Sequence, residues 1–188
     1  MVIMVEDVAL LVAGVFGWTF LEYLIHGWLS HTFHTFAMRL HAVHHRDAHA
    51  VFTVRAWIPI AVVWMMMAVL FGWTPGVILF SGAALGFVGY EAIHYRIHFC
   101  HPRGPIETFL RSRHLVHHEY YPNRCLGVTS ALWDLAFGTE PMGTAMTERC
   151  ESLRSRPPLT GRTNLYKLKN HVVLFPLREH LARHPRTQ

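Results

Sequence analysis

The stretch AWIPIAVVWMMMAVLFGWTPGVILFSGAALGFVGY, residues 56–90, contains 35 consecutive residues without Asp, Glu, Lys or Arg. It predicts two apolar helical spans, Trp57–Trp73 and Val77–Tyr90, separated by a turn at Thr74-Pro75-Gly76. A further apolar run covers Val8–Leu21. Each run alone also suits a buried helix of a soluble protein, but the chain is 52% hydrophobic and only 15% charged, whereas soluble domains are roughly 25% charged. We therefore expect an all-α integral membrane protein with three to four transmembrane helices.

The basic residues predict the orientation of these spans. All 17 Lys and Arg residues lie within residues 39–55 or 96–188. Because positive residues accumulate on the cytoplasmic side of a membrane, residues 26–56 and 94–188 are expected in the cytoplasm, including the C-terminus. The net charge of +5 is explained by contact with anionic lipid head groups and requires no nucleic acid as a partner.

Histidine is concentrated on that same side of the membrane. Positions i, i+3 and i+4 share one face of a helix, so an H-x2-H-H triplet is expected to aim three ring nitrogens at one point. Five or six imidazoles suit one metal ion, and ten therefore predict a helical two-metal site that caps the spans on the cytoplasmic side. Ten of the 16 histidines form four such clusters, which are His26-x4-His31, His41-x2-His44-His45, His94-x3-His98 and His114-x2-His117-His118.

The ligand type narrows the choice of metal. Structural zinc prefers four-ligand sites with thiolates, whereas the three cysteines of this chain are widely spaced. The chain also lacks the H-E-x-x-H motif of zinc hydrolases and the pair of Glu-x-x-His motifs used by soluble di-iron bundles. An all-histidine pair of metals beside a membrane favours oxygen chemistry at iron, although ligand type alone leaves zinc and copper open.

Three carboxylates are expected to support the ligands. Glu22 lies four residues before His26, and Glu91 lies three residues before His94. Each is expected to accept a hydrogen bond from the free ring nitrogen of that ligand. Asp134 is a third candidate. No side chain beyond the metal ligands is expected to be catalytic.

The chain is expected to divide near residue 140. Residues 1–140 form the membrane-embedded domain, with shorter helices within residues 32–55, over Ile106–Glu119 and over Trp133–Phe137. Residues 141–188 form a basic C-terminal tail. Its segment Leu165–Leu181 mixes apolar and basic residues, which suits either an amphipathic helix on the membrane surface or a disordered tail.

The four clusters, with Glu22-Tyr23 before the first and His94-Tyr95 in the third, resemble the fatty acid hydroxylase/sterol desaturase superfamily. The run Gly127-Val-Thr-Ser-Ala-Leu-Trp-Asp-Leu-Ala-Phe-Gly-Thr139 is similar to its fatty acid 2-hydroxylase branch. The resemblance covers about residues 15–140 and implies a membrane di-iron monooxygenase that uses O2 to hydroxylate a lipid C–H bond. It also implies that all ten clustered histidines bind the two iron ions, which zinc can replace in a purified sample.

The resemblance has limits that leave the substrate open. Gly27 stands where the family commonly has arginine, Glu91 stands where it has aspartate, and the short spacing between His31 and His41 resembles compact carotenoid hydroxylases. A fused cytochrome b5 domain is also not expected in this chain. A separate electron donor is therefore implied, which would be a ferredoxin, a cytochrome b5-like protein or a reductase.

A fatty acyl chain is the leading substrate, and a carotenoid, sterol-like ring or other polyisoprenoid is the alternative, with hydroxylation or desaturation as the outcome. A non-catalytic metal-binding or transport protein is an alternative of another class. It would need polar groups within its spans to form an ion path, and residues 56–90 contain no charged residue. A zinc-dependent membrane hydrolase is disfavoured by the missing carboxylate base.

Overall fold

The computed structural model describes residues 4–33, 35–48, 57–140 and 144–158, and every regular element in these ranges is a helix. The prediction of an all-helical protein is therefore confirmed for the described part of the chain. In chain order the elements are α1 (Val5–Leu24), the π-helix η1 (Ile25–Thr32), α2 (Phe36–Arg46), α3 (Trp57–Leu70), α4 (Trp73–Phe99), α5 (Pro105–Glu119), α6 (Leu132–Phe137) and α7 (Thr144–Arg154).

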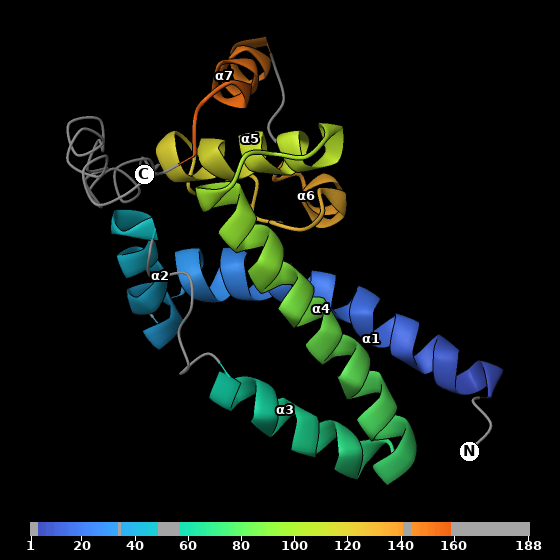
Figure 1. Cartoon of the computed structure of the whole chain (residues 1–188). Helices are drawn as coiled ribbons and strands as arrows, with labels where there is room; N and C mark the ends of the chain where they lie inside the picture. Colours follow the sequence, from blue (N-terminus) through green and yellow to red (C-terminus); the bar gives the residue numbers. More distant parts are fainter. Residues whose placement is uncertain (1–3, 34, 49–56, 141–143, 159–188) are drawn as a thin grey trace, which may run out of the picture.

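The centre of the fold is the crossing of α1 and α4 (Figure 1). The two backbones meet at Gly14 and Gly82, where a Cβ on Gly14 would lie 2.0 Å from the carbonyl oxygen of Leu79. Any larger residue at these positions would separate the helices, since small residues allow the close approach of helix backbones. Nearer the histidines, Trp18 of α1 packs edge-on against Phe87 of α4, with ring centroids 5.0 Å apart.

Two helices are long and apolar enough to cross a membrane, namely the continuous α1–η1 segment Val5–Thr32 and α4. Their outward faces carry large exposed apolar side chains such as Val12, Phe16, Leu85 and Val88, which indicates association with a membrane. The third apolar helix, α3, has 14 residues, fewer than the roughly 20 that a perpendicular crossing needs. A third crossing and the cytoplasmic orientation therefore stay predictions.

The predicted turn at Thr74-Pro75-Gly76 is wrong by a few residues. The break between α3 and α4 falls at Phe71–Gly72, where Gly72 has φ of 84°, a value that favours glycine. Pro75 instead lies in the first turn of α4. Proline is tolerated there because the N–H groups of a first helical turn have no partner within the helix.

The remaining helices gather around the C-terminal ends of η1 and α4. Helix α2 lies beside η1, α5 follows α4, and α6 lies against α1 (Figure 1). Helix α7 packs on α5, where its Leu153 joins Leu115, Val116 and Cys125 in a small apolar core. Helices are found over Pro105–Glu119 and Leu132–Phe137, close to their predicted bounds. The segment predicted at Leu165–Leu181 lies outside the described residues.

Candidate metal centre

The π-helix η1 brings the first histidine pair together. His26 and His31 are five residues apart, and in an α-helix they would point about 140° away from each other. The wider turn of a π-helix, with its bonds from i to i+5, places their ring centroids 5.4 Å apart. Gly27 makes room for the neighbouring loop, since a Cβ there would lie 2.7 Å from Leu126 Cδ1. The sequence spacing alone gave no sign of this π-helix.

Each H-x2-H-H triplet is divided between two sites, and the expectation that a triplet aims at one point is wrong. In α2, His41 and His45 point to one site and His44 to the other. In α5, His114 and His118 go together and His117 goes to the opposite site. The reason is angular, because residues i and i+4 lie about 40° apart around a helix, whereas i+3 and i+4 lie about 100° apart.

The ten predicted histidines form two groups of five. Within each group the ring nitrogens lie within 4.8 Å of one another, and the two groups touch where the rings of His45 and His118 stack at 4.1 Å. Each group takes four residues from one half of the chain and one from the other. We call them the first histidine group (His26, His31, His41, His45, His117) and the second histidine group (His44, His94, His98, His114, His118).

In the first histidine group, the unprotonated ring nitrogens of His26 and His117 face each other. His26 Nδ1 donates to the carbonyl oxygen of Leu126 at 2.5 Å, and His117 Nδ1 donates to that of Arg124 at 2.9 Å. A neutral imidazole carries only one ring proton, so Nε2 of both rings is an acceptor, yet these two atoms lie 3.0 Å apart. Two nitrogens bound at right angles to one ion, each about 2.1 Å from it, would be about 3 Å apart. The geometry therefore fits a cation between them.

The second histidine group has the same spacing. Nε2 of His114 lies 3.0 Å from Nε2 of both His94 and His98. Both ring nitrogens of His44 and Nε2 of His118 are buried without a hydrogen-bond partner among the described residues. An unsatisfied buried polar atom costs about 1–3 kcal/mol, and ligation to a metal ion would remove that cost.

Burial keeps the imidazoles outside the candidate spans in the neutral form that metals bind. Desolvation lowers the pKa of His44 and His45 to about 3, and neighbouring histidines add to the effect. The pKa of His114, His117 and His118 also falls well below the usual value because these rings are buried. All five rings are therefore neutral at physiological pH, which is the form whose nitrogen can bind a metal ion.

Glu22 is buried, but it does not accept the hydrogen bond from His26 that the sequence predicted. Its carboxylate accepts hydrogen bonds from the backbone N–H of Val128 at 2.6 Å and of Thr129 at 2.9 Å, and from the Thr129 hydroxyl at 2.5 Å. Three donors on one loop outcompete a single ring N–H for the carboxylate. The free nitrogen of His26 donates instead to the Leu126 carbonyl of that same loop.

Asp134 holds the other end of this loop. One carboxylate oxygen accepts from the N–H of Leu126 at 2.7 Å and the other from the N–H of Gly127 at 2.8 Å. The second oxygen also forms a buried ion pair with Arg113, whose guanidinium in addition contacts Glu140. Loop 125–130 is thus held by Glu22 on one side and Asp134 on the other, and it presents a carbonyl to His26. The sequence pointed to both carboxylates but not to this loop.

The predicted hydrogen bond from His94 to Glu91 is not formed. His94 Nδ1 and Glu91 Oε2 are both buried without a partner among the described residues. The other ring nitrogen, His94 Nε2, lies 3.0 Å from Nε2 of His114.

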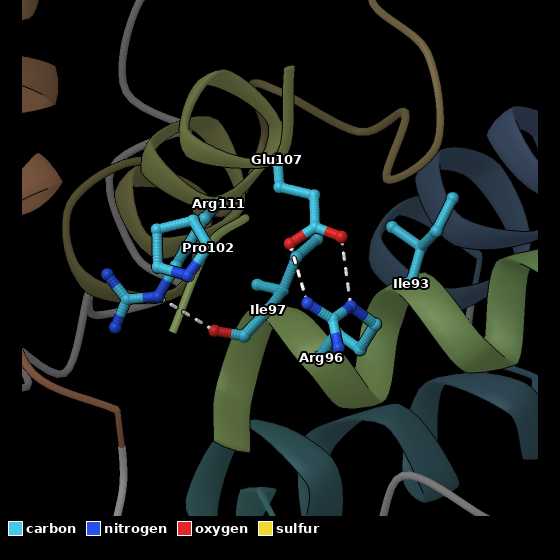
Figure 2. A pocket seen from close by; sticks show the side chains of 6 residues that line it. All are labelled: Ile93, Arg96, Ile97, Pro102, Glu107 and Arg111. Carbon is cyan, nitrogen blue, oxygen red and sulfur yellow. Dashed lines mark hydrogen bonds and ion pairs between the residues drawn. The ribbon is translucent and has the colours of Figure 1, made fainter. Parts of the chain in front are cut away.

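An ion pair joins α4 and α5 next to the metal centre. Figure 2 shows the Arg96 guanidinium bound to the Glu107 carboxylate beside a small pocket that both residues line. Arg96 Nε donates to Oε1 at 2.9 Å and Nη2 donates to Oε2 at 2.8 Å. In the same view Arg111 of α5 donates to the carbonyl oxygen of Ile97 at 3.0 Å. No histidine lines this pocket. Its contacts tie the end of α4 that carries His98 to the helix that carries the last triplet.

Comparison with known proteins places this geometry in a family. Residues 11–139 match the family model for fatty acid hydroxylase. The chain is 32% identical over 149 residues to the dihydroceramide fatty acyl 2-hydroxylase FAH1 of Arabidopsis thaliana, an alignment that covers 72% of this chain and 62% of the relative. It is 33% identical over 146 residues to the fatty acid 2-hydroxylase of Mus musculus, covering 70% of this chain and 39% of the relative.

The fold agrees with these alignments. A solved structure of full-length scs7p, in which only the hydroxylase domain is visible, superposes with a TM-score of 0.66 and 26% sequence identity, covering 82% of this chain and 59% of that one. This chain spans about three fifths of the length of the Arabidopsis relative. Since the family model matches more than half of the chain and includes all ten clustered histidines, the chain belongs to the fatty acid hydroxylase family.

Proposed function

We propose that this chain is a membrane-embedded di-iron monooxygenase that hydroxylates a C–H bond of a fatty acyl chain. The observation that carries the proposal is the convergence of ten imidazoles into two groups of five at the ends of two apolar helices. The family to which the chain belongs supplies the class of reaction.

The residues of the chain act by holding and orienting the metal ligands. Two iron ions, one in each histidine group, would supply the redox chemistry in which one oxygen atom of O2 enters the C–H bond and the other leaves as water, with uptake of two electrons and two protons. The carbonyl oxygens of Leu126 and Arg124 keep the protons of His26 and His117 on Nδ1, so that Nε2 is free to bind. No side chain serves as a nucleophile. The same ligands also suit zinc in a purified sample.

The three predicted carboxylates have positioning roles in this proposal. Glu22 and Asp134 act through loop 125–130, whose carbonyl group orients His26. Glu91 lies one helical turn before His94 on α4, and the proposal keeps it as a carboxyl group that supports the second histidine group. None of the three has to bind metal, because each histidine group already offers five nitrogens.

The membrane placement follows from charge and hydropathy. In our proposal three or four helices cross the bilayer, with residues 1–140 as the hydroxylase domain and the histidine groups on the cytoplasmic side. The distribution of all 17 basic residues supports this orientation. Residues 141–188 form the C-terminal segment, also cytoplasmic, in which α7 lies against α5.

A lipid from the bilayer is the substrate in this proposal. The names of the relatives, a dihydroceramide fatty acyl 2-hydroxylase and a fatty acid 2-hydroxylase, favour an acyl chain over a carotenoid or another polyisoprenoid. The electrons come from a separate ferredoxin, cytochrome b5-like protein or reductase.

Mass spectrometry of total lipids tests the proposal. Cells that express the chain together with a compatible reductant are compared with cells that express His44→Ala, which removes one ligand from the second histidine group. We expect acyl lipids that gain one oxygen atom only with the unaltered chain. His101→Ala is the matched control, because His101 is exposed and belongs to neither group.

Other outcomes would contradict the proposal. Lipids that lose two hydrogens instead of gaining oxygen would identify a desaturase. Oxygen in polyisoprenoids would refute the acyl substrate. Unchanged lipids, with the protein folded and metal-loaded, would refute an oxidative role.

A further inference from the structure

The outward face of α6 is entirely apolar. Residues 132, 135 and 136 fall within about 100° around the helix axis, and they are Leu132, Leu135 and Ala136. All three are exposed, with Leu135 at 65%. A helix on the surface of a soluble domain normally turns polar residues outward. This face is therefore suited to contact with an apolar environment rather than with water.

The opposite face of α6 packs on the candidate membrane helix α1. The Trp133 ring lies 4.6 Å from that of Phe20 and 5.7 Å from that of Phe16, measured between centroids. Phe137 stacks on Tyr23 at 5.3 Å. These contacts fix the position of α6 along α1.

That position lies at the end of the uncharged run of α1. Phe16 and Phe20 fall in the last two turns of the uncharged run Val8–Leu21, and Glu22 follows directly. From Phe16 to the end of this run a helix rises only about 7 Å. Phe16 is itself exposed, so the outward apolar surface of α1 continues onto α6.

Several polar groups of α6 are bound within the protein. The indole N–H of Trp133 donates to the Thr19 hydroxyl at 2.9 Å, and the N–H of Leu132 is bound by the Ser130 hydroxyl at 3.1 Å. At the other end the N–H of Gly138 is bound by the carbonyl oxygen of Asp134. Polar groups that enter the lipid phase must be bound within the protein, and the indole N–H of Trp133 and the backbone N–H groups of Leu132 and Leu135 are.

We propose that the outward face of α6 (Leu132, Leu135, Ala136) is immersed in the lipid leaflet next to the histidine groups and sets their depth. The inference rests on the membrane placement within the proposed function and does not depend on the catalytic activity. Asp134 on the same helix binds the N–H groups of residues 126 and 127, and this loop binds His26. The depth of α6 in the leaflet is thereby transmitted to the first histidine group.

Fluorescence quenching tests this immersion. The full chain carrying Cys100→Ser and Cys150→Ser, with the buried Cys125 retained, receives L135C and a small environment-sensitive fluorophore. It is reconstituted in phosphatidylcholine vesicles that contain phosphatidylcholine spin-labelled near the head-group end of the acyl chain. We expect the label at position 135 to be quenched several-fold more by the spin-labelled lipid than by aqueous iodide.

Two reference positions make the result decisive. L85C on α4 reports a side chain in the middle of a candidate span, and E151C on α7 reports a solvent-exposed one. If position 135 behaves like 151 while 85 is shielded from iodide, the inference is wrong and the membrane placement stands. If 85 is also quenched by iodide, the membrane placement itself is wrong.

A label at 135 shielded from both quenchers would also overturn the inference, because a protein surface such as a second copy of the chain would then cover this face. A136C on the same face repeats the measurement if L135C does not fold, with metal content as the check on folding.

Discussion

Replacing Asp134 with asparagine should destabilise the protein and weaken its first metal site. One carboxylate oxygen accepts from Leu126 N–H and from the Thr139 hydroxyl, and the other accepts from Gly127 N–H and from Arg113 Nη2. All four distances lie between 2.7 and 2.8 Å, and the side chain is fully buried. An asparagine amide has nearly the same shape but only one acceptor oxygen, so either orientation turns an NH2 group toward two donors.

The magnitude follows from these four contacts. Two buried donors lose their acceptor, at about 1–3 kcal/mol each, and a buried ion pair loses one partner, a change that costs about 3–5 kcal/mol. Arg113 keeps its contact with Glu140, which favours the lower end of that range. Taken at the lower ends of these ranges, the expected loss is about 5 kcal/mol, and hence a thermal midpoint lower by about 10 to 20 °C for a chain of this size.

The effect should reach the metal through the peptide group of Leu126. Its N–H is held by Asp134, while its carbonyl group orients His26. Loss of an outer contact of a metal ligand typically weakens binding by about 10- to 100-fold. For D134N in detergent we therefore expect metal affinity in the first histidine group to fall by about tenfold, measured by mass spectrometry of bound metal during titration with a chelator.

The control is Glu151→Gln, which removes a carboxylate from the exposed pair with Arg154. Exposed pairs contribute about 0–1 kcal/mol, so this variant should unfold close to the unaltered protein. If D134N kept both its thermal midpoint and its metal affinity, the contacts of Asp134 would not support the loop, and the reasoning would fail.

Three further predictions concern the metal ligands, the helix crossing and acid stability. His31→Ala is expected to halve the bound metal per chain because it opens only one histidine group, whereas His101→Ala should leave metal content unchanged; equal loss of both metals would contradict two separate groups. Gly14→Ala should lower the thermal midpoint by several degrees, since its Cβ would lie 2.0 Å from a backbone carbonyl oxygen, while Gly17→Ala meets open space and should not. The metal-free protein should lose stability as pH falls from about 6.5 towards 3, measured by thermal unfolding at a series of pH values, because burial lowers the pKa of His44 and His45 to about 3 and only the unfolded chain takes up their protons in that range; a flat profile would contradict their burial.

The helices were largely predictable because their signals are local. The uncharged residues 56–90 and the run Val8–Leu21 predicted apolar helices, and the helix predicted over Ile106–Glu119 is close to the observed α5. The turn before α4 was misplaced, since proline suits both a turn and the first turn of a helix. Gly72, whose positive φ makes the break, carries no sequence mark that distinguishes it from the other glycines nearby.

The roles of the carboxylates were less predictable. Spacing along one helix placed Glu22 beside His26, but the carboxylate is held by Val128 and Thr129, which are distant in sequence. A helical spacing reports only neighbours on the same helix. It carries no information about a loop that lies more than 100 residues later in the sequence.

The sequence by itself determined the helical class, the apolar character of the long helices, and the ten histidines as one set, because periodicity and composition are properties of neighbouring residues. Only the tertiary structure decided how these histidines divide into two groups and which nitrogen each ring presents. His26 approaches His117, 91 residues away, and its proton is fixed by a carbonyl group 100 residues away. The arrangement of the site depends on how α1, α4 and α5 meet, since the direction of a ring is set by the packing and hydrogen bonds around it.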